Sequence, residues 1–206
     1  MLRELLKFET PYIEMQTLRV WLEGYQNPKD YVSRLVKNGE LVRLKNGFFI
    51  IADRIKDKPI PFEQIANLLY GPSYISLEYA LSYYGMIPER AYVKTSITTN
   101  RTKHFHTPIG TFSYHSLSLE RYYVGVHHKE NELGGFYMAT PEKALADHVF
   151  QLCQGLNRDE LLIDLTESKR MEMTTLKSLD KALMQQISSA YRSKIVKTLA
   201  EVIISL

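Results

Sequence analysis

The sequence predicts an α+β fold, in which a small N-terminal module of helices and a hairpin precedes a larger domain with a mainly antiparallel sheet and several helices. Three observations predict this fold. Apolar residues recur at helical spacing in the first forty and the last fifty residues. An Asn-Gly pair at residues 46–47 separates two apolar runs. Five short runs rich in β-branched and aromatic residues lie between residues 91 and 139.

The composition is that of an ordinary globular protein, with 206 residues, 45% of them hydrophobic and 24% charged. No apolar run approaches the roughly 18 residues of a membrane helix. The first residues include Glu4 and lack the apolar core of a signal peptide. We therefore expect a cytoplasmic protein with no membrane partner. The single cysteine, Cys153, stands among apolar residues, so we expect a buried thiol rather than a disulfide or a reactive group.

Positive charge is concentrated near the N-terminus. Residues 1–56 hold ten Lys/Arg and seven Asp/Glu, and the remaining chain holds sixteen of each. The whole net charge of +3 therefore belongs to the first quarter of the sequence. Basic segments attract polyanions such as nucleic acids. An excess of three positive charges is weak evidence for such binding by itself, so the position of these charges in the predicted fold matters more.

Two helices are predicted in this first quarter. The first covers residues 17–23 and ends at Gly24. The second follows Asn27, a good N-cap, and begins with Pro28, which suits a first helical turn. Its apolar residues are spaced i, i+3 and i+4, so this face must pack inward and leave a basic face outside. The apolar residues are Val32, Leu35 and Val36.

A β-hairpin is predicted after the second helix. Residues 41–44 and 48–51 are apolar runs around an Asn-Gly turn, the strongest local signal of a hairpin. The order of helix, turn, basic helix and hairpin predicts a winged helix-turn-helix. Its second helix fits the major groove of DNA, and its hairpin tip lies along the neighbouring backbone. The predicted DNA-binding residues are Lys29, Ser33, Arg34, Lys37, Arg43, Lys45 and Asn46.

Arg34 is the best candidate for reading a base, because a guanidinium group can bond guanine through two hydrogen bonds. Two alternatives stay open. A winged helix can dock another protein instead of DNA, and a basic helix face can be ordinary solvated surface. Arg43 also has an alternative partner in Glu40, across the turn between helix and hairpin.

The predicted domain boundary is proline-rich. Pro59 and Pro61 cannot continue a helix or a central strand, so residues 57–61 are the expected linker. The expected domains are residues 1–56 and 62–206. In the second we expect helices over 62–70, 74–84, 141–152 and most of the last fifty residues, with N-caps at Ser73 and Thr140. The strands are expected at 91–98, 103–107, 111–115, 121–127 and 135–139.

An enzyme acting on nucleic acid through the sheet domain is the third function considered. His104 and His106 fall on one face of a strand, as metal ligands can, but Arg101 and Lys103 would repel a cation. These two basic residues are a candidate second polyanion surface, or simply a charged loop. No phosphate-binding loop or nucleophile motif is present in the sequence. We therefore predict no catalytic residue, metal or cofactor.

Three stretches carry a resemblance to a known family. They are LVKNGELVRLKNG at residues 35–47, YISLEYALSYYGMIP at 74–88 and ATPEKALAD at 139–147. Together and in this order they resemble the AbiEi antitoxins of bacterial abortive-infection systems, which are type IV toxin–antitoxin systems. The resemblance extends from about Thr17 to about Val149. The region before Trp21 carries no distinctive match, and the helical tail adds little.

The resemblance implies a two-domain protein whose winged helix represses its own operon by binding double-stranded promoter repeats. It implies that the C-terminal domain counteracts a nucleotidyltransferase-like toxin without forming a tight complex with it. The DNA-binding role then falls on the basic and polar residues named above for the second helix and the hairpin. The chemistry gives no role to five other matching residues. These are Ser76, Glu78, Pro141, Glu142 and Lys143.

Overall fold

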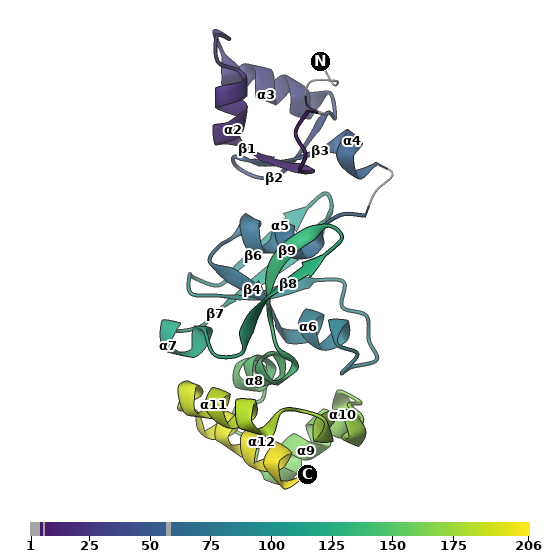
Figure 1. The fold of residues 1–206 in the computed structure, drawn as a ribbon, viewed down its shortest axis with the longest axis vertical. Helices are drawn as coiled ribbons and strands as arrows, with labels where there is room; N and C mark the ends of the chain where they lie inside the picture. Colours follow the sequence, from purple (N-terminus) through teal and green to yellow (C-terminus); the bar gives the residue numbers. More distant parts are fainter. Residues whose placement is uncertain (1–4, 6, 57–58) are drawn as a thin grey trace.

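The structure is a computed structural model that describes residues 5, 7–56 and 59–206. It has a mixed α+β fold, in which the described residues form a three-stranded and a six-stranded sheet. Figure 1 shows three tiers along the long axis of the molecule: the smaller sheet with its helices, the larger sheet, and the C-terminal helices. Residues 57–58 of the predicted linker lie outside the described residues.

The first tier contains the two predicted helices and the predicted hairpin, preceded by a strand that the sequence did not indicate. Its elements are β1 (Tyr12–Glu14), α2 (Met15–Trp21), α3 (Pro28–Lys37), β2 (Leu41–Lys45), β3 (Phe48–Ile51) and α4 (Ala52–Ile55). Asn27 stands at the predicted N-cap position of α3, although its side chain makes no capping hydrogen bond. Gly39 and Gly47 have positive φ values of 74° and 80° at the end of α3 and in the hairpin turn. The strands pair antiparallel in the order β1-β3-β2.

Both faces of the three-stranded sheet are covered. On one face, Phe49 packs with Leu18 of α2 and Leu35 of α3. On the other face, Phe48 and Ile50 belong to the hydrophobic core of the rest of the protein. Burying such a side chain contributes about 2 kcal/mol, so these contacts fasten the first tier to the second. The sequence predicts a separate module and does not indicate this packing.

The second tier is a sheet with the strand order β6-β7-β5-β4-β9-β8. Its elements are α5 (Phe62–Leu69), β4 (Ser73–Ile75), α6 (Leu77–Tyr83), β5 (Lys94–Thr98), β6 (Lys103–Thr107), β7 (Gly110–Ser116), α7 (Leu119–Tyr122), β8 (Val126–Asn131) and β9 (Gly134–Ala139). Three neighbouring pairs are antiparallel, whereas β4–β9 and β5–β7 are parallel. The sheet is therefore mixed rather than mainly antiparallel.

Two predicted elements are wrong in part. The expected helix over 74–84 begins only at Leu77, because the preceding residues form β4, a strand buried between β5 and β9. The expected strand over 121–127 begins with the short helix α7, and β8 starts at Val126. In both places pairing and packing with distant parts of the chain override the local pattern. Other strands and helices of this tier agree with the prediction to within a few residues.

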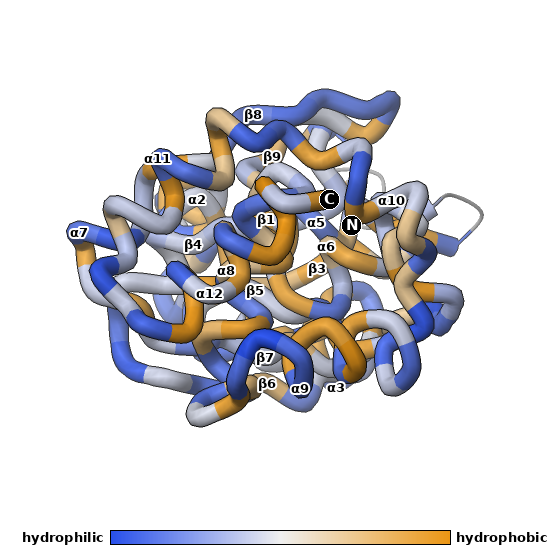
Figure 2. The backbone as a smooth tube through the Cα atoms, turned by 90° about the horizontal axis from the view of Figure 1, so that it is seen from below, coloured by the Kyte–Doolittle hydropathy of each residue, from blue (hydrophilic) through white to orange (hydrophobic). Residues whose placement is uncertain are grey.

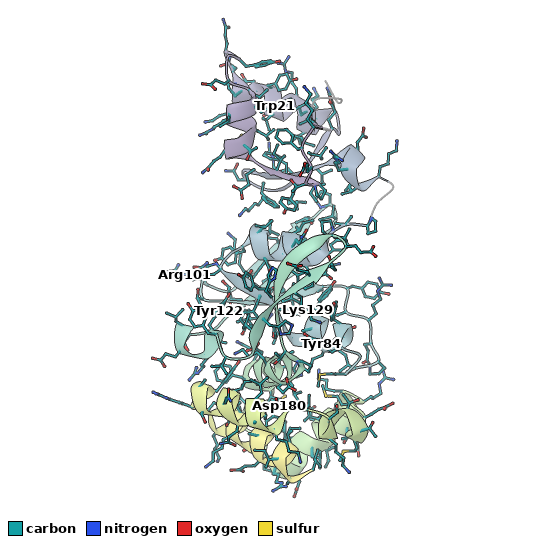
Figure 3. The ribbon with its side chains drawn as sticks, in the orientation of Figure 1. Trp21, Tyr84, Arg101, Tyr122, Lys129 and Asp180 are labelled. Atoms are coloured by element: carbon teal, nitrogen blue, oxygen red, sulfur yellow. The ribbon has the colours of Figure 1, made fainter. Side chains whose placement is uncertain are left out.

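The edge strand β8 is hydrophilic and lies at the rim of the molecule (Figure 2). Lys129 of this strand places its ammonium group 4.6 Å from the ring centroid of Tyr84, and Figure 3 shows the two side chains near each other. A charged, hydrophilic edge discourages pairing with a strand of another chain. This feature therefore protects one of the open edges of the sheet.

The third tier is helical, as predicted for the end of the chain. Its elements are α8 (Pro141–Leu152), α9 (Arg158–Ile163), the π-helix η1 (Asp164–Ser168), α10 (Met173–Lys177), α11 (Lys181–Tyr191) and α12 (Lys194–Ser205). Thr140 caps α8 as predicted, because its hydroxyl accepts a hydrogen bond from the Lys143 amide. Figure 1 shows α8 between the sheet and the other helices. Along the described residues, no helix has the length and apolar character that crossing a membrane requires.

A buried polar network joins the second and third tiers. The Asp147 carboxylate accepts hydrogen bonds from Ser76 Oγ at 2.6 Å, from Tyr74 OH at 3.0 Å and from Tyr191 OH. Lys143 Nζ lies 3.4 Å from the same carboxylate, and the side chains of this ion pair are fully buried. The network links β4 and the start of α6 to α8 and α11. Ser76 and Lys143, which had no role at the level of sequence, are therefore parts of the core.

Two other residues of the resembling blocks also lie in structural contacts. Glu142 Oε1 accepts a hydrogen bond from the backbone N–H of Asp180 at 2.9 Å, which ties α8 to the start of α11. Glu78 Oε1 lies 3.3 Å from Nδ1 of the buried His148. Burial raises the pKa of Glu78, but the hydrogen bond with His148, a backbone hydrogen bond and nearby positive charge together outweigh it and lower the pKa to about 2. These contacts account for the two glutamates without invoking a ligand.

The Cys153 thiol is expected to react slowly in the folded protein. Cys153 is 5% exposed, and its Sγ lies 3.7 Å from Asp164 Oδ2. Burial, followed by the nearby carboxylate, raises the pKa of the thiol to about 11. Since the thiolate is the reactive form, labelling by Ellman's reagent at about pH 8 should be roughly 100-fold slower than in the urea-unfolded chain. The rate should rise with pH towards 11, and equal rates in the folded and unfolded chain would contradict the buried thiol.

Candidate nucleic-acid interface

A surface hollow of about 420 Å³ lies in the first tier, where α2, α3 and the β2–β3 hairpin meet. Its lining residues are Met15, Arg19, Lys29, Val32, Ser33, Arg43, Asn46 and Gly47. Val32 is buried beneath it, whereas the polar and charged residues of the lining are exposed. The hollow therefore has an apolar base and a rim of basic and hydrogen-bonding groups. We call it the hairpin hollow.

The local structure explains how the hairpin hollow is built. Lys29 and Ser33 lie one turn apart on α3, and Ser33 Oγ donates a hydrogen bond to the Lys29 carbonyl at 2.9 Å. The hairpin turn is tied to α2, because the Gly47 carbonyl accepts a hydrogen bond from the Met15 amide at 2.8 Å. The Arg43 guanidinium lies 5.7 Å from the centroid of the Phe49 ring, which supports it from below. Helix and hairpin are thus held in a fixed relation to each other.

The hairpin hollow is electropositive. Three cationic side chains line it, from Arg19, Lys29 and Arg43, and no carboxylate is among its lining residues. Within the part of the chain that the structure describes, none of the three cations forms an ion pair, so Arg43 does not use its alternative partner Glu40. Three unpaired cations around one concave surface attract an anion. A phosphate backbone is a chemically suitable occupant, since its charge and its acceptor oxygens match these donors.

Four of the seven sequence-predicted residues come together in this hollow. They are Lys29, Ser33, Arg43 and Asn46. Arg34 and Lys37 are exposed on α3 but lie outside the hollow. The Arg34 guanidinium lies 5.4 Å from the centroid of the Tyr31 ring, on the same helix. These two residues extend the basic surface along α3.

Lys45 points elsewhere. Its ammonium group donates a hydrogen bond to the Leu69 carbonyl at 2.7 Å, across the contact between the first two tiers. Burial lowers the pKa of Lys45, and this effect outweighs the attraction to Glu14, which raises it. The register of the hairpin shifts between Arg43 and Lys45, so alternation along β2 does not place both side chains on the same face. We therefore leave Lys45 out of the candidate interface.

Arg19 is the cation of the hairpin hollow that sequence reasoning missed. It follows the buried Leu18 on α2 and is exposed. The sequence does place Arg19 on the outer face of the first helix. The hairpin turn approaches that face through Gly47. That approach is a tertiary contact, and the helical pattern alone did not indicate it.

The candidate second surface around β6 is built differently. Arg101 is exposed at the periphery of the larger sheet (Figure 3). Lys103 Nζ lies 5.0 Å from the centroid of the Phe105 ring. His104 faces His115 on β7, with ring centroids 6.2 Å apart, rather than forming a pair with His106. Among the residues described, no group of three or more His, Cys, Asp or Glu side chains is placed to hold a metal ion.

Neither a protein-family model nor a curated protein matches this chain. Two features of the chain itself therefore point to a function: the geometry and charge of the hairpin hollow, and the three resembling stretches of sequence. Of these two supports, the hollow is the one that experiments on the chain itself can test directly.

Proposed function

We propose that residues 1–56 form a winged helix-turn-helix that binds duplex DNA. In this proposal α3 enters the major groove and the β2–β3 hairpin lies along the adjacent backbone. The observation that carries it is the concave, electropositive hairpin hollow, in which three cations form no ion pair with any residue that the structure describes. Arg19, Lys29 and Arg43 supply phosphate contacts. Arg34, on the exposed face of α3, remains the candidate base reader.

We further propose that the chain is an AbiEi-type antitoxin that represses its own operon and is not an enzyme. The resemblance of residues 35–47, 74–88 and 139–147 supports this assignment. The antitoxin role belongs to the domain that follows the winged helix, acting against a nucleotidyltransferase-like toxin without a tight complex. Expressing that toxin from the neighbouring gene, with and without this chain, tests the role. Growth arrest that the chain fails to relieve would refute it.

DNA binding is expected to be measurable and steeply dependent on salt. With about three phosphate contacts, the affinity should fall roughly 40-fold between about 50 and about 200 mM monovalent salt, since each contact releases condensed counterions. Fluorescence anisotropy with a labelled duplex from upstream of the chain's own gene measures this, and an unrelated duplex of equal length is the control. Absence of binding to either duplex at the lowest salt would overturn the proposal. Equal affinity for both duplexes would overturn the part that concerns autorepression.

A further inference from the structure

A hollow of about 510 Å³ opens on the second tier, between α7, the β8–β9 hairpin and the end of α5. Its volume lies within the range of small-molecule sites, which is roughly 300–1,000 Å³. We call it the tyrosine hollow. The lining side chains that determine what it can bind are Leu68, Ser73, Tyr122, Tyr123, His127 and Tyr137. The proposed DNA-binding surface uses none of these residues, so the hollow needs its own explanation.

Large apolar side chains gather around this hollow and remain exposed in the chain as it stands. Leu68, Tyr123 and Tyr137 are 41%, 66% and 56% exposed. Tyr122, which Figure 3 shows beside the β8–β9 hairpin, is only 8% exposed and lies deeper. Single apolar side chains on a surface are ordinary, whereas several around one concavity mark a place where something binds.

The aromatic side chains are held in position by their neighbours. The Tyr122 ring packs edge-to-face on the buried Tyr74, with ring centroids 4.8 Å apart. The Tyr137 amide donates a hydrogen bond to Asn67 Oδ1 at 2.6 Å, and Asn67 Nδ2 donates to the Tyr137 carbonyl at 3.3 Å. The Tyr137 ring also lies 5.4 Å from the ring of His128. A ligand would therefore find these rings already ordered, which lowers the entropic cost of binding.

The tyrosine hollow is uncharged. Among the described residues that line it, none is Lys, Arg, Asp or Glu. Burial, followed by the charge of Lys129, lowers the pKa of His127 against the weaker attraction of Glu142, so its imidazole is neutral at neutral pH. Burial raises the pKa of Tyr122 to about 12, so its hydroxyl keeps its proton. An anion or cation bound there would lack a counter-charge, and this favours an uncharged ligand.

Hydrogen-bonding groups in the hollow lack partners. Ser73 is 5% exposed, and its buried hydroxyl makes no hydrogen bond to any residue that the structure describes. The Tyr122 hydroxyl also makes none within the described chain. His127 Nε2 lies 3.4 Å from Tyr84 OH, which donates its own proton to the Ala139 carbonyl. Nε2 is therefore the protonated nitrogen, and Nδ1 is left as an acceptor.

Open donors and an open acceptor in an apolar site point to a ligand that carries the complementary groups. Polar side chains as deeply buried as Ser73 are nearly always hydrogen-bonded, so its hydroxyl indicates a partner that the described chain does not supply. A purely aliphatic ligand would leave all of these groups unpaired. A planar heteroaromatic ring has both donors and acceptors on its edge, and its faces stack on phenol rings.

We propose that the tyrosine hollow binds an uncharged, planar heteroaromatic small molecule of the nucleoside class. The ring stacks on Tyr137, and its edge forms hydrogen bonds with Ser73, Tyr122 and His127. The volume of the hollow leaves room for a substituent such as a sugar beside the ring. This site lies outside the proposed DNA-binding surface and does not depend on it.

Calorimetric titration of the full chain with adenosine and, separately, with uridine tests the proposal. We expect at least one of the two to bind saturably at one site per chain. Tyr137→Ala should weaken this binding about tenfold, because it removes a stacking face. Ser73→Ala should weaken it about threefold through the loss of one hydrogen bond. Neither melting temperature should fall appreciably, because the Tyr137 side chain is exposed and the Ser73 hydroxyl has no partner among the described residues.

Tyr92→Ala is the matched control, because Tyr92 is an exposed tyrosine of the same tier that does not line the tyrosine hollow. It should leave nucleoside binding unchanged, and equal weakening by this variant would reveal unspecific stacking and refute the site. Failure of both nucleosides to bind saturably, or unchanged binding in both folded variants Tyr137→Ala and Ser73→Ala, would also overturn the proposal.

Two further ligands test the chemical class. Cyclohexanol, an uncharged ring without a π face, should bind at least about tenfold more weakly than the nucleoside. Equal binding would reduce the site to a general apolar cavity. Adenosine 5′-monophosphate should bind no more tightly than adenosine, because no cation among the described residues lines the hollow. Tighter binding of the phosphate would overturn the uncharged class. The Lys29→Ala/Arg43→Ala variant should bind the nucleoside like the wild type, which separates this site from the proposed DNA-binding function.

Discussion

Replacing Lys29 and Arg43 together by alanine is expected to lower the affinity for duplex DNA by at least about 100-fold. Both cations line the hairpin hollow, one from α3 and the other from β2. A hydrogen bond to a charged group is worth about 1.5–3 kcal/mol, so losing two such contacts costs at least about 3 kcal/mol. The slope of log affinity against log salt should also become shallower by about two, because two fewer counterions are released. Anisotropy across a salt series measures both effects.

The matched control for this double variant is Lys56→Ala. Lys56 is an exposed lysine of the same tier that does not line the hairpin hollow. It should change the affinity by less than about threefold, through long-range electrostatics alone. The melting temperature of each variant shows whether the fold persists. Wild-type affinity in the folded Lys29→Ala/Arg43→Ala variant would sink the assignment of the hairpin hollow as the DNA-binding surface.

The Arg34→Ala/Lys37→Ala variant separates base reading from backbone contact. Both residues lie on α3 outside the hairpin hollow, so the comparison asks which side of the helix faces DNA. If Arg34 reads a guanine, this variant loses the preference for the chain's own promoter over an unrelated duplex, by about 1–3 kcal/mol. If only the hairpin hollow contacts DNA, the affinity of this variant for both duplexes falls slightly and by the same factor.

Local signals explain why the first tier was predictable in outline. The Asn-Gly turn fixes the hairpin, and the apolar spacing of Val32 and Leu35 fixes the buried face of α3. Strand β1 is too short for a pattern to be visible, and it is formed by pairing with β3. The strand β4 shows the same limit. Its residues Tyr74 and Ile75 fit a helix locally but pair with strands from distant parts of the sequence.

The candidate site shows a corresponding division between local and tertiary information. Lys29 and Ser33 were predictable because helical spacing places them on one face. Lys45 was not, because a shift in register turns it towards Leu69 and away from Arg43. The buried polar side chains in the resembling stretches could be matched by sequence, but their role could not be predicted. The role of a polar residue in a core depends on the groups that it hydrogen-bonds or pairs with, and only the structure shows these groups.

The buried ion pair carries the largest expected effect on stability. Asp147→Ala should lower the free energy of unfolding by about 3–5 kcal/mol, as measured by urea denaturation, because it leaves the buried Lys143 without its charged partner. Burial lowers the pKa of Lys143, while attraction to Asp147 acts in the opposite direction. Removing the carboxylate therefore leaves Lys143 with either an unpaired charge or a neutral amine whose formation costs free energy. The hydroxyl groups of Tyr74 and Tyr191 lose their acceptor at the same time.

The double variant Lys143→Met/Asp147→Leu tests whether this loss comes from the unpaired charge. Replacing both members of a buried pair by apolar residues of similar volume is often close to neutral. The hydroxyl groups of Ser76, Tyr74 and Tyr191 lose their acceptor in both variants, so this cost cancels when the two are compared. The double variant should therefore be more stable than Asp147→Ala, because it leaves no unpaired charge. If the loss of stability in the double variant equals the sum of the losses in Lys143→Met and Asp147→Leu, the two residues are not coupled. Asp147 then acts through its hydrogen bonds to β4 and α11 rather than through Lys143. In that case the carboxylate, and not the ion pair, holds the C-terminal helices against the sheet.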